Sequence, residues 1–134
     1  LTGTVVTGDL NGRYPELPWG VYDLVVANPP YFPQHTGKTA PDTARALART
    51  EGNYTLRAGC EAASKLCRSG GKFALCLRPE RLAELFAALA DTGFAPKRLQ
   101  LLQPSAEREA NLALVEAVRG GKPGLRILPV RIER

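Results

Sequence analysis

Residues 23 to 32, DLVVANPPYF, place an amide, two prolines and a phenol directly after an apolar run. Pro29 lacks a backbone donor and holds Asn28 extended, and Pro30 stiffens the chain beyond it. We therefore expect the backbone carbonyls of Asn28 and Pro29 to project into a cleft, with the flat ring of Tyr31 beside them. Such a set of acceptors next to a stacking surface suits a planar group that carries an NH2.

The amino group of adenine is a poor nucleophile because its lone pair is delocalised into the ring. Two acceptors on its N–H bonds, from the Asn28 side chain and the Pro29 carbonyl, would favour a pyramidal nitrogen whose lone pair can attack an electrophilic methyl group. Tyr31 would stack on the base. This is catalysis by positioning and electrostatics, and it needs no strong general base. The alternative is that Asn-Pro-Pro forms only a rigid turn between a strand and a loop.

The elements that must position these residues follow an α/β pattern. Residues 21–27 are predicted to form a strand whose apolar residues are contiguous rather than alternating, which is typical of a parallel strand that is buried on both faces. Ligands in open α/β sheets bind at the carboxyl ends of such strands, which is where Asn28 lies. Apolar spacing predicts a helix over 54–67 that residues 69–71, Ser-Gly-Gly, bring to an end, and a strand follows at 72–77.

The second half of the chain continues the pattern. Pro79 is suited to the first turn of a helix whose buried stripe is Leu82, Leu85, Phe86 and Leu89, with Gly93 at its end. Strands are predicted at 98–103 and 111–118, and they form an antiparallel pair because no helix separates them. A further strand at 1–10, ending at Asp9, and a short helix at 43–49 are also predicted. The fold class is α/β: a parallel sheet closed by an antiparallel hairpin.

Composition excludes several classes of protein. The 134 residues are 44% hydrophobic, with a net charge of +5 that permits a polyanionic partner without requiring one. No apolar run reaches the ~18 residues that span a bilayer, so no membrane segment is expected. Three cysteines, at 60, 67 and 76, lack the spacing of metal ligands, which predicts buried thiols in a reducing, cytoplasmic compartment and no metal site.

The segment DLVVANPPYF resembles motif IV of the class I S-adenosylmethionine-dependent amino-methyltransferases, which methylate adenine N6 or glutamine N5. The segment VVTGDL resembles the part of these enzymes whose Asp contacts the adenine amino group of the methyl donor, and this Asp corresponds to Asp9. Downstream, GGKFALCLRPERLAELFAAL and PKRLQLLQPSAEREANLALVEAVRGGKPGL are similar to the bacterial tRNA adenine-N6 methyltransferases that modify the adenine next to the anticodon of a valine tRNA.

The resemblance implies a Rossmann-like fold, S-adenosyl-L-methionine as cofactor and tRNA as partner. It also implies three groups of site residues. The catalytic group is Asn28, Pro29 and Tyr31. The donor-binding group is Asp9 and Asn28, and the substrate-binding group is Pro30, Phe32, Lys38, Arg78 and Arg81. Two other functions stay open: methylation of a protein glutamine or of another nucleic acid, and a non-catalytic RNA-binding module that has kept the fold.

The resemblance also implies that part of the enzyme is not in this chain. Residues 1–134 begin with Leu1, contain no Met, and lack a Gly-rich loop between a strand and a helix. We therefore expect one partial methyltransferase domain, the carboxyl-terminal portion of a longer enzyme, that alone binds the donor weakly or not at all. In the strand order of this family, the strand at 21–27 would then become an exposed apolar edge through which copies of the chain associate.

Overall fold

Strands and helices alternate along the chain as the apolar patterns predict. A computed structural model describes residues 17–29 and 55–133. The strands of this part are β1 (Tyr22–Ala27), β2 (Cys67–Leu77), β3 (Phe94–Gln103), β4 (Leu112–Arg119), β5 (Arg126–Ile127) and β6 (Arg131–Ile132). The helices are α2 (Leu56–Leu66), the 3-10 turn η1 (Pro79–Arg81) and α3 (Leu82–Asp91). The expectations for residues 1–10 and 43–49 lie outside the described residues.

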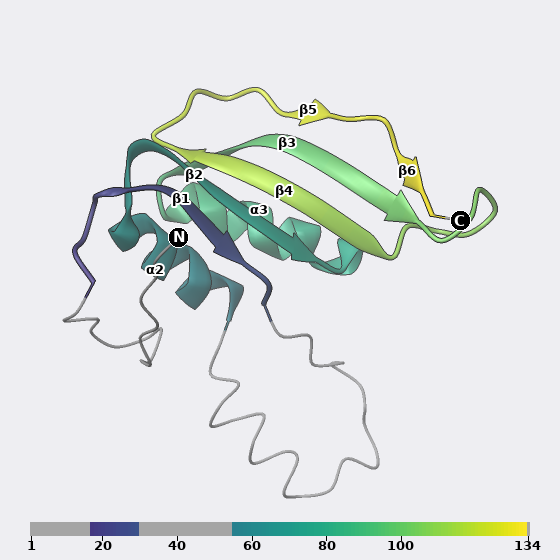
Figure 1. Cartoon of the computed structure of the whole chain (residues 1–134), viewed down its shortest axis with the longest axis horizontal. Helices are drawn as coiled ribbons and strands as arrows, with labels where there is room; N and C mark the ends of the chain where they lie inside the picture. Colours follow the sequence, from purple (N-terminus) through teal and green to yellow (C-terminus); the bar gives the residue numbers. More distant parts are fainter. Residues whose placement is uncertain (1–16, 30–54, 134) are drawn as a thin grey trace, which may run out of the picture.

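The strands form one mixed sheet in the order β1-β2-β4-β3-β5, with β6 also paired to β3. β1 and β2 are parallel, whereas β4 is antiparallel to both of its neighbours, β2 and β3. Both helices lie on the same side of this sheet, and the chain from β5 to β6 runs along β3 (Figure 1). The α/β class and the antiparallel closing hairpin are therefore confirmed. Because β1, β2 and β3 run in the same direction, their carboxyl ends share one edge of the sheet.

The helices and the sheet enclose one apolar core. Leu56 and Cys60 of α2 and Leu85 and Leu89 of α3 are at most 1% exposed, and Leu82 and Phe86 are partly buried against them, as the predicted stripe requires. Thr55 caps α2, because its Oγ1 accepts a hydrogen bond of 2.9 Å from the backbone N–H of Ala58. The strand residues that face the helices are Phe73, Leu75, Leu77, Leu99, Ala113, Val115 and Ala117.

The prediction that residues 69–71 end the helix is wrong. Helix α2 ends at Leu66 and β2 begins immediately at Cys67, so Ser-Gly-Gly lies inside the strand. The pairing with β1 jumps from Tyr22–Cys67 to Leu24–Lys72, so β2 carries a large bulge that takes up these residues. Gly70 adopts a φ of 82° within this bulge. Glycines that resemble a helix stop in the sequence are here the bend that starts a strand.

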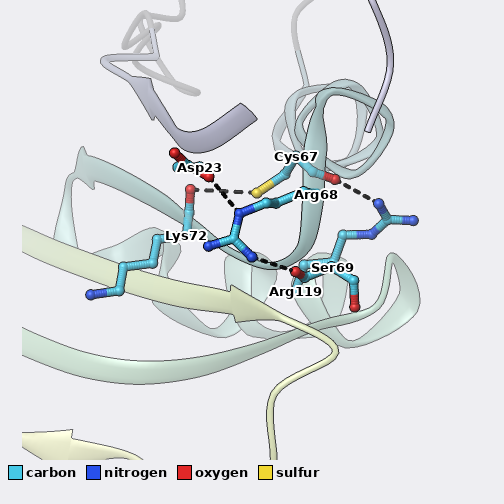
Figure 2. Close-up of polar contacts among 6 residues, drawn as sticks. All are labelled: Asp23, Cys67, Arg68, Ser69, Lys72 and Arg119. Atoms are coloured by element: carbon cyan, nitrogen blue, oxygen red, sulfur yellow. Dashed lines mark hydrogen bonds and ion pairs between the residues drawn. The ribbon is translucent and has the colours of Figure 1, made fainter. Parts of the chain in front are cut away.

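Polar contacts hold the bulge (Figure 2). Arg68 Nε donates to Asp23 Oδ1 on β1, and its Nη1 donates to the carbonyl of Ser69 at 2.9 Å. From β4, Arg119 Nη1 donates to the carbonyl of Cys67 at 2.6 Å. These contacts fix the start of β2 between its two neighbouring strands, and they thereby fix the register in which β1 runs toward its carboxyl end.

Strand β1 is parallel to β2, as its contiguous apolar sequence predicts, but its burial on both faces is not observed. Val25 and Ala27 pack against the core, while Leu24 and Val26 on the other face are 55% and 68% exposed. Within the described part of the chain, β1 has a neighbour on one side only. The expectation of an exposed apolar edge at this strand is confirmed for these residues.

Candidate active site at the carboxyl edge of the sheet

Asn28 directly follows the last residue of β1, at the carboxyl edge predicted for it. Its side-chain oxygen Oδ1 accepts a hydrogen bond from the thiol of Cys76 on β2, with an S–O distance of 3.2 Å. Pro29 follows and is partly buried. Asn28 is exposed, and this hydrogen bond ties its side-chain amide to the neighbouring strand.

A cavity of about 410 Å³ opens over the sheet face that lies away from the helices, and Asn28 and Cys76 are among its lining residues. The wall is largely apolar, with Val26, Ala74 and Leu114 from three neighbouring strands. Strand β1 therefore brings both an apolar surface and the Asn28 amide to this cavity.

The cavity also contains a matched pair of charges. Arg98 Nε and Nη2 donate to the two carboxylate oxygens of Glu116, each at 3.1 Å. Because the two charges pair with each other across β3 and β4, they offer no net charge to a ligand. Gln100 donates to the carbonyl of Pro129 at 3.0 Å, which ties the chain between β5 and β6 to the cavity rim. The lining therefore favours a neutral group over an ion.

A second cavity, of about 880 Å³, lies at the same sheet edge between the end of β2 and the loop from β3 to β4. Arg78 follows β2 directly and lines this cavity, and its Nη2 lies 3.4 Å from Glu80 Oε2. The backbone N–H of Glu80, and then Arg78, hold the pKa of the Glu80 carboxyl below its ordinary value, so this group is ionised at neutral pH. From the loop between β3 and β4, the cavity lining includes Arg108 and two glutamates, Glu107 and Glu109.

Arg81, at the end of η1, is engaged with the first turn of α3. Its Nη2 and Nε donate to the two carboxylate oxygens of Glu84, at 2.9 Å and 3.2 Å. The i,i+3 spacing of this pair is visible in the sequence. Both arginines predicted to contact substrate thus lie near the carboxyl edge, as expected, but each already contacts a glutamate. The other predicted site residues, Asp9, Pro30, Tyr31, Phe32 and Lys38, lie outside the described residues.

Sequence reasoning missed Cys76, which it treated as one of three buried structural thiols. Cys60 and Cys67 fit that description, at 1% and 0% exposed, and burial raises the pKa of Cys60 to about 11. Cys76 is only partly buried and faces the opposite side of the sheet. The signal that finds it is the strand period of two: counted back from the core residues Leu75 and Leu77, Cys76 must face the other way.

Comparison with known proteins identifies relatives of this chain. It is 37% identical over 94 residues to a tRNA1(Val) (adenine(37)-N6)-methyltransferase of Tolumonas auensis, a match that covers 70% of the chain and 39% of the relative. The enzyme of the same name from Parabacteroides distasonis is 32% identical over 115 residues, covering 84% of the chain and 48% of the relative. This chain is homologous to part of these enzymes. It spans less than half the length of either one. No protein-family model matches it.

Solved structures show the same fold as this chain. A predicted O-methyltransferase from Agrobacterium tumefaciens superposes with a TM-score of 0.67 at 25% identity, covering 92% of the chain and 50% of that protein. A candidate DNA modification methylase from Thermus thermophilus, solved with S-adenosyl-L-methionine, has a TM-score of 0.50 at 17% identity and covers 86% and 53% of the two chains. The sheet and its two helices therefore belong to the Rossmann-like methyltransferase architecture.

Proposed function

We propose that the protein transfers a methyl group from S-adenosyl-L-methionine to N6 of an adenine in tRNA, with this chain as the part that carries the methyl-accepting site. The observation that carries the proposal is the Asn28 amide, held at the carboxyl end of β1 on the wall of a largely apolar cavity. The relatives' names supply the substrate class. A cytoplasmic location follows from a tRNA substrate. None of the helices in residues 17–29 and 55–133 is long and apolar enough to cross a membrane.

The described residues provide the acceptor half of the chemistry. Asn28 Oδ1 has two lone pairs, of which one accepts from Cys76 and the other is available to an adenine N–H. A second acceptor, the Pro29 carbonyl, would hold the other N–H. Together they localise the nitrogen lone pair for attack, and the proton released after methylation passes to water. S-adenosyl-L-methionine supplies the electrophilic methyl group on a sulfonium.

The described residues fit only part of S-adenosyl-L-methionine. The amide oxygen and the apolar wall suit an adenine ring and a methyl group. However, the residues that directly follow β1, β2 and β3 are Asn28, Arg78 and Pro104, none of which is a carboxylate that could hold a ribose. We propose that Asp9 contacts the donor, that Tyr31 stacks on the base, and that Pro30, Phe32 and Lys38 contact the RNA.

Arg78 and Arg81 are proposed to meet RNA phosphates at the same edge. A guanidinium carries five N–H groups, and the contact of Arg81 with Glu84 uses donors on only two of its nitrogens. An adenine in a single-stranded loop reaches Asn28 at low cost, since it leaves its stack more easily than a base in a duplex. The RNA bound here is therefore proposed to be a loop rather than a helix.

We further propose that residues 1–134 form one partial methyltransferase domain whose donor-binding half is supplied by residues outside this chain. Two observations support this: the chain spans 39% to 48% of the relatives' length, and the sheet face away from the helices presents Leu24, Val26 and Leu114 to solvent. On its own, the chain is proposed to bind the donor weakly and to associate with itself through β1.

The deciding experiment uses the gene product that contains these residues. It is incubated with labelled S-adenosyl-L-methionine and unmodified total tRNA, and the labelled nucleoside is identified by mass spectrometry after digestion. N6-methyladenosine is the expected product. An unlabelled tRNA pool, with the donor shown to be bound, would refute the tRNA proposal and redirect the search to a protein glutamine or another nucleic acid.

The role of Asn28 has its own test. Asn28→Ala removes the acceptor that grips the amine, so the rate of methyl transfer should fall by roughly 100-fold or more, the usual effect of removing one preorganised polar group. Donor binding, measured by calorimetry, should fall far less than the rate, because Asp9 keeps its proposed contact with the donor. Ser69→Ala is the control, because it removes a small polar side chain from the opposite end of β2 and should leave the rate intact. Near-normal turnover in Asn28→Ala would contradict the assigned role.

A further inference from the structure

The hydrogen bond between Cys76 and Asn28 joins two strands that are 48 residues apart in sequence. Ala27 pairs with Leu75 in the parallel register, so the next positions on the two strands, Asn28 and Cys76, lie side by side on the face away from the helices. In the described part of the chain, no other side chain bonds to the Asn28 amide. The thiol is thus the one described group that holds the functional end of this side chain.

An asparagine needs such a partner. Pro29 restricts the backbone of Asn28, but it has no effect on the terminal torsion of the side chain, which is soft and roughly two-fold. The two ends of the amide have opposite roles, because the oxygen accepts and the NH2 donates. Only the oxygen end can accept an adenine N–H. A fixed donor on the neighbouring strand turns the oxygen end of the amide toward itself and the NH2 end away.

A thiol is well suited to this task within the cavity. It donates one hydrogen bond, and the oxygen that receives it still has a second lone pair. The surroundings of Cys76 on this face are apolar, with Ala74 on the same strand and Leu114 across on β4. The charged groups of the cavity, Arg98 and Glu116, bond to each other. The orientation of the Asn28 amide therefore depends on Cys76.

We propose that Cys76 is a positioning residue for the methyl-transfer site: its thiol orients the Asn28 amide so that the oxygen meets the amino group of the substrate. This inference rests on the proposed function for its catalytic consequence, but the orientation of the amide can be measured without any reaction. Cys76 itself does not touch the transferred methyl group in this proposal, and it acts through Asn28.

The test separates a donated hydrogen bond from simple packing. Cys76→Val keeps an apolar side chain of similar size but removes the donor, and Cys76→Ser keeps a donor. In the full gene product, the single-turnover rate should fall roughly 3- to 10-fold in Cys76→Val, which corresponds to one net hydrogen bond. Cys76→Ser should stay within about 2-fold of the wild type, a margin well below the loss of one such bond. The KM for tRNA and the Kd for the donor should change far less than the rate, because the other proposed contacts to the RNA and to the donor are kept in both variants.

The second measurement is a ¹H–¹⁵N spectrum of the side-chain NH2 of Asn28, assigned by its absence in Asn28→Ala. Cys76→Val should shift or broaden this signal, and Cys76→Ser should leave it close to its wild-type position. An unchanged signal in Cys76→Val, or equal rate losses in the serine and valine variants, would overturn the inference. If the wild-type protein methylates no tRNA adenine, the proposed function fails, and the spectrum alone decides whether Cys76 orients Asn28.

Discussion

Gly71 lies at the point where the bulge of β2 returns to its pairing with β1, and replacing it with alanine tests how tightly this bend is built. A Cβ at Gly71 would lie 2.5 Å from Cys67 Sγ, 2.9 Å from the carbonyl oxygen of Tyr22 and 3.0 Å from that of Arg68. The backbone of Gly71 does not have a positive φ, so the cost is steric alone. Two of the three atoms are backbone oxygens, and the side-chain contacts of Arg68 with Asp23 and Ser69 hold the neighbouring chain in place (Figure 2).

The expected cost is at the upper end of the range for overpacking, about 3 kcal/mol of unfolding free energy, because two of the three contacts are with backbone oxygens that cannot rotate away. Gly20→Ala provides the matched control. Gly20 has a φ of 72°, but a Cβ there meets nothing within 4 Å, so its cost is that of the left-handed backbone alone, about 1 kcal/mol. The two variants therefore separate steric overlap from backbone strain.

Urea unfolding of the gene product, followed by circular dichroism, measures both variants. A third variant, Gly71→Ala with Cys67→Ala, removes the contact with sulfur but keeps both carbonyl contacts, so it should recover only part of the loss. If Gly71→Ala is no less stable than Gly20→Ala, the bend is looser than its contacts indicate, and the argument that it fixes the register of β1 is wrong.

Two further predictions concern other parts of the fold. Burial raises the pKa of Cys60 from 9.0 to about 11, so the folded protein keeps a proton that the unfolded chain releases. The stability from this thiol is therefore full below pH 9 and is lost between pH 9 and about pH 11; urea unfolding across this range should show a smaller decline in Cys60→Ala, and equal declines would contradict it. Light scattering should give the 134-residue chain a mass larger than that of a monomer. Val26→Lys places a charge on the exposed face of β1 and should shift the chain to a monomer. A monomeric wild type would refute the association.

Much of the fold could be predicted because local patterns report it directly. The stripe of α3 places Leu85 and Leu89 four residues apart, and the structure buries both. The lack of a helix between β3 and β4 required an antiparallel pair, and the register confirms it. The position of Asn28 followed from the same reasoning, since a polar residue directly after a contiguous apolar strand lies at the carboxyl edge of a parallel sheet.

The parts that could not be predicted depend on contacts between distant segments. Glycines at 70 and 71 have the same local sequence signal whether they end a helix or bend a strand, and only the pairing with β1 decides between the two. The Cys76–Asn28 contact depends on that same register, so it was also out of reach. Burial of β1 on both faces was predicted from its composition, but burial depends on what covers the strand rather than on its own residues.

The two edges of the sheet differ, and this limits how many copies of the 134-residue chain can join edge to edge. On the far side, β3 is flanked by β5 and β6, each only two residues long and separated by Pro129. Short strands with a proline between them offer a poor template for another chain. In the described residues, β1 is thus the single strand edge open to a neighbour. Each copy can pair through this edge only once, so two paired copies leave no free edge. Edge pairing therefore favours a closed two-fold dimer over an open fibre.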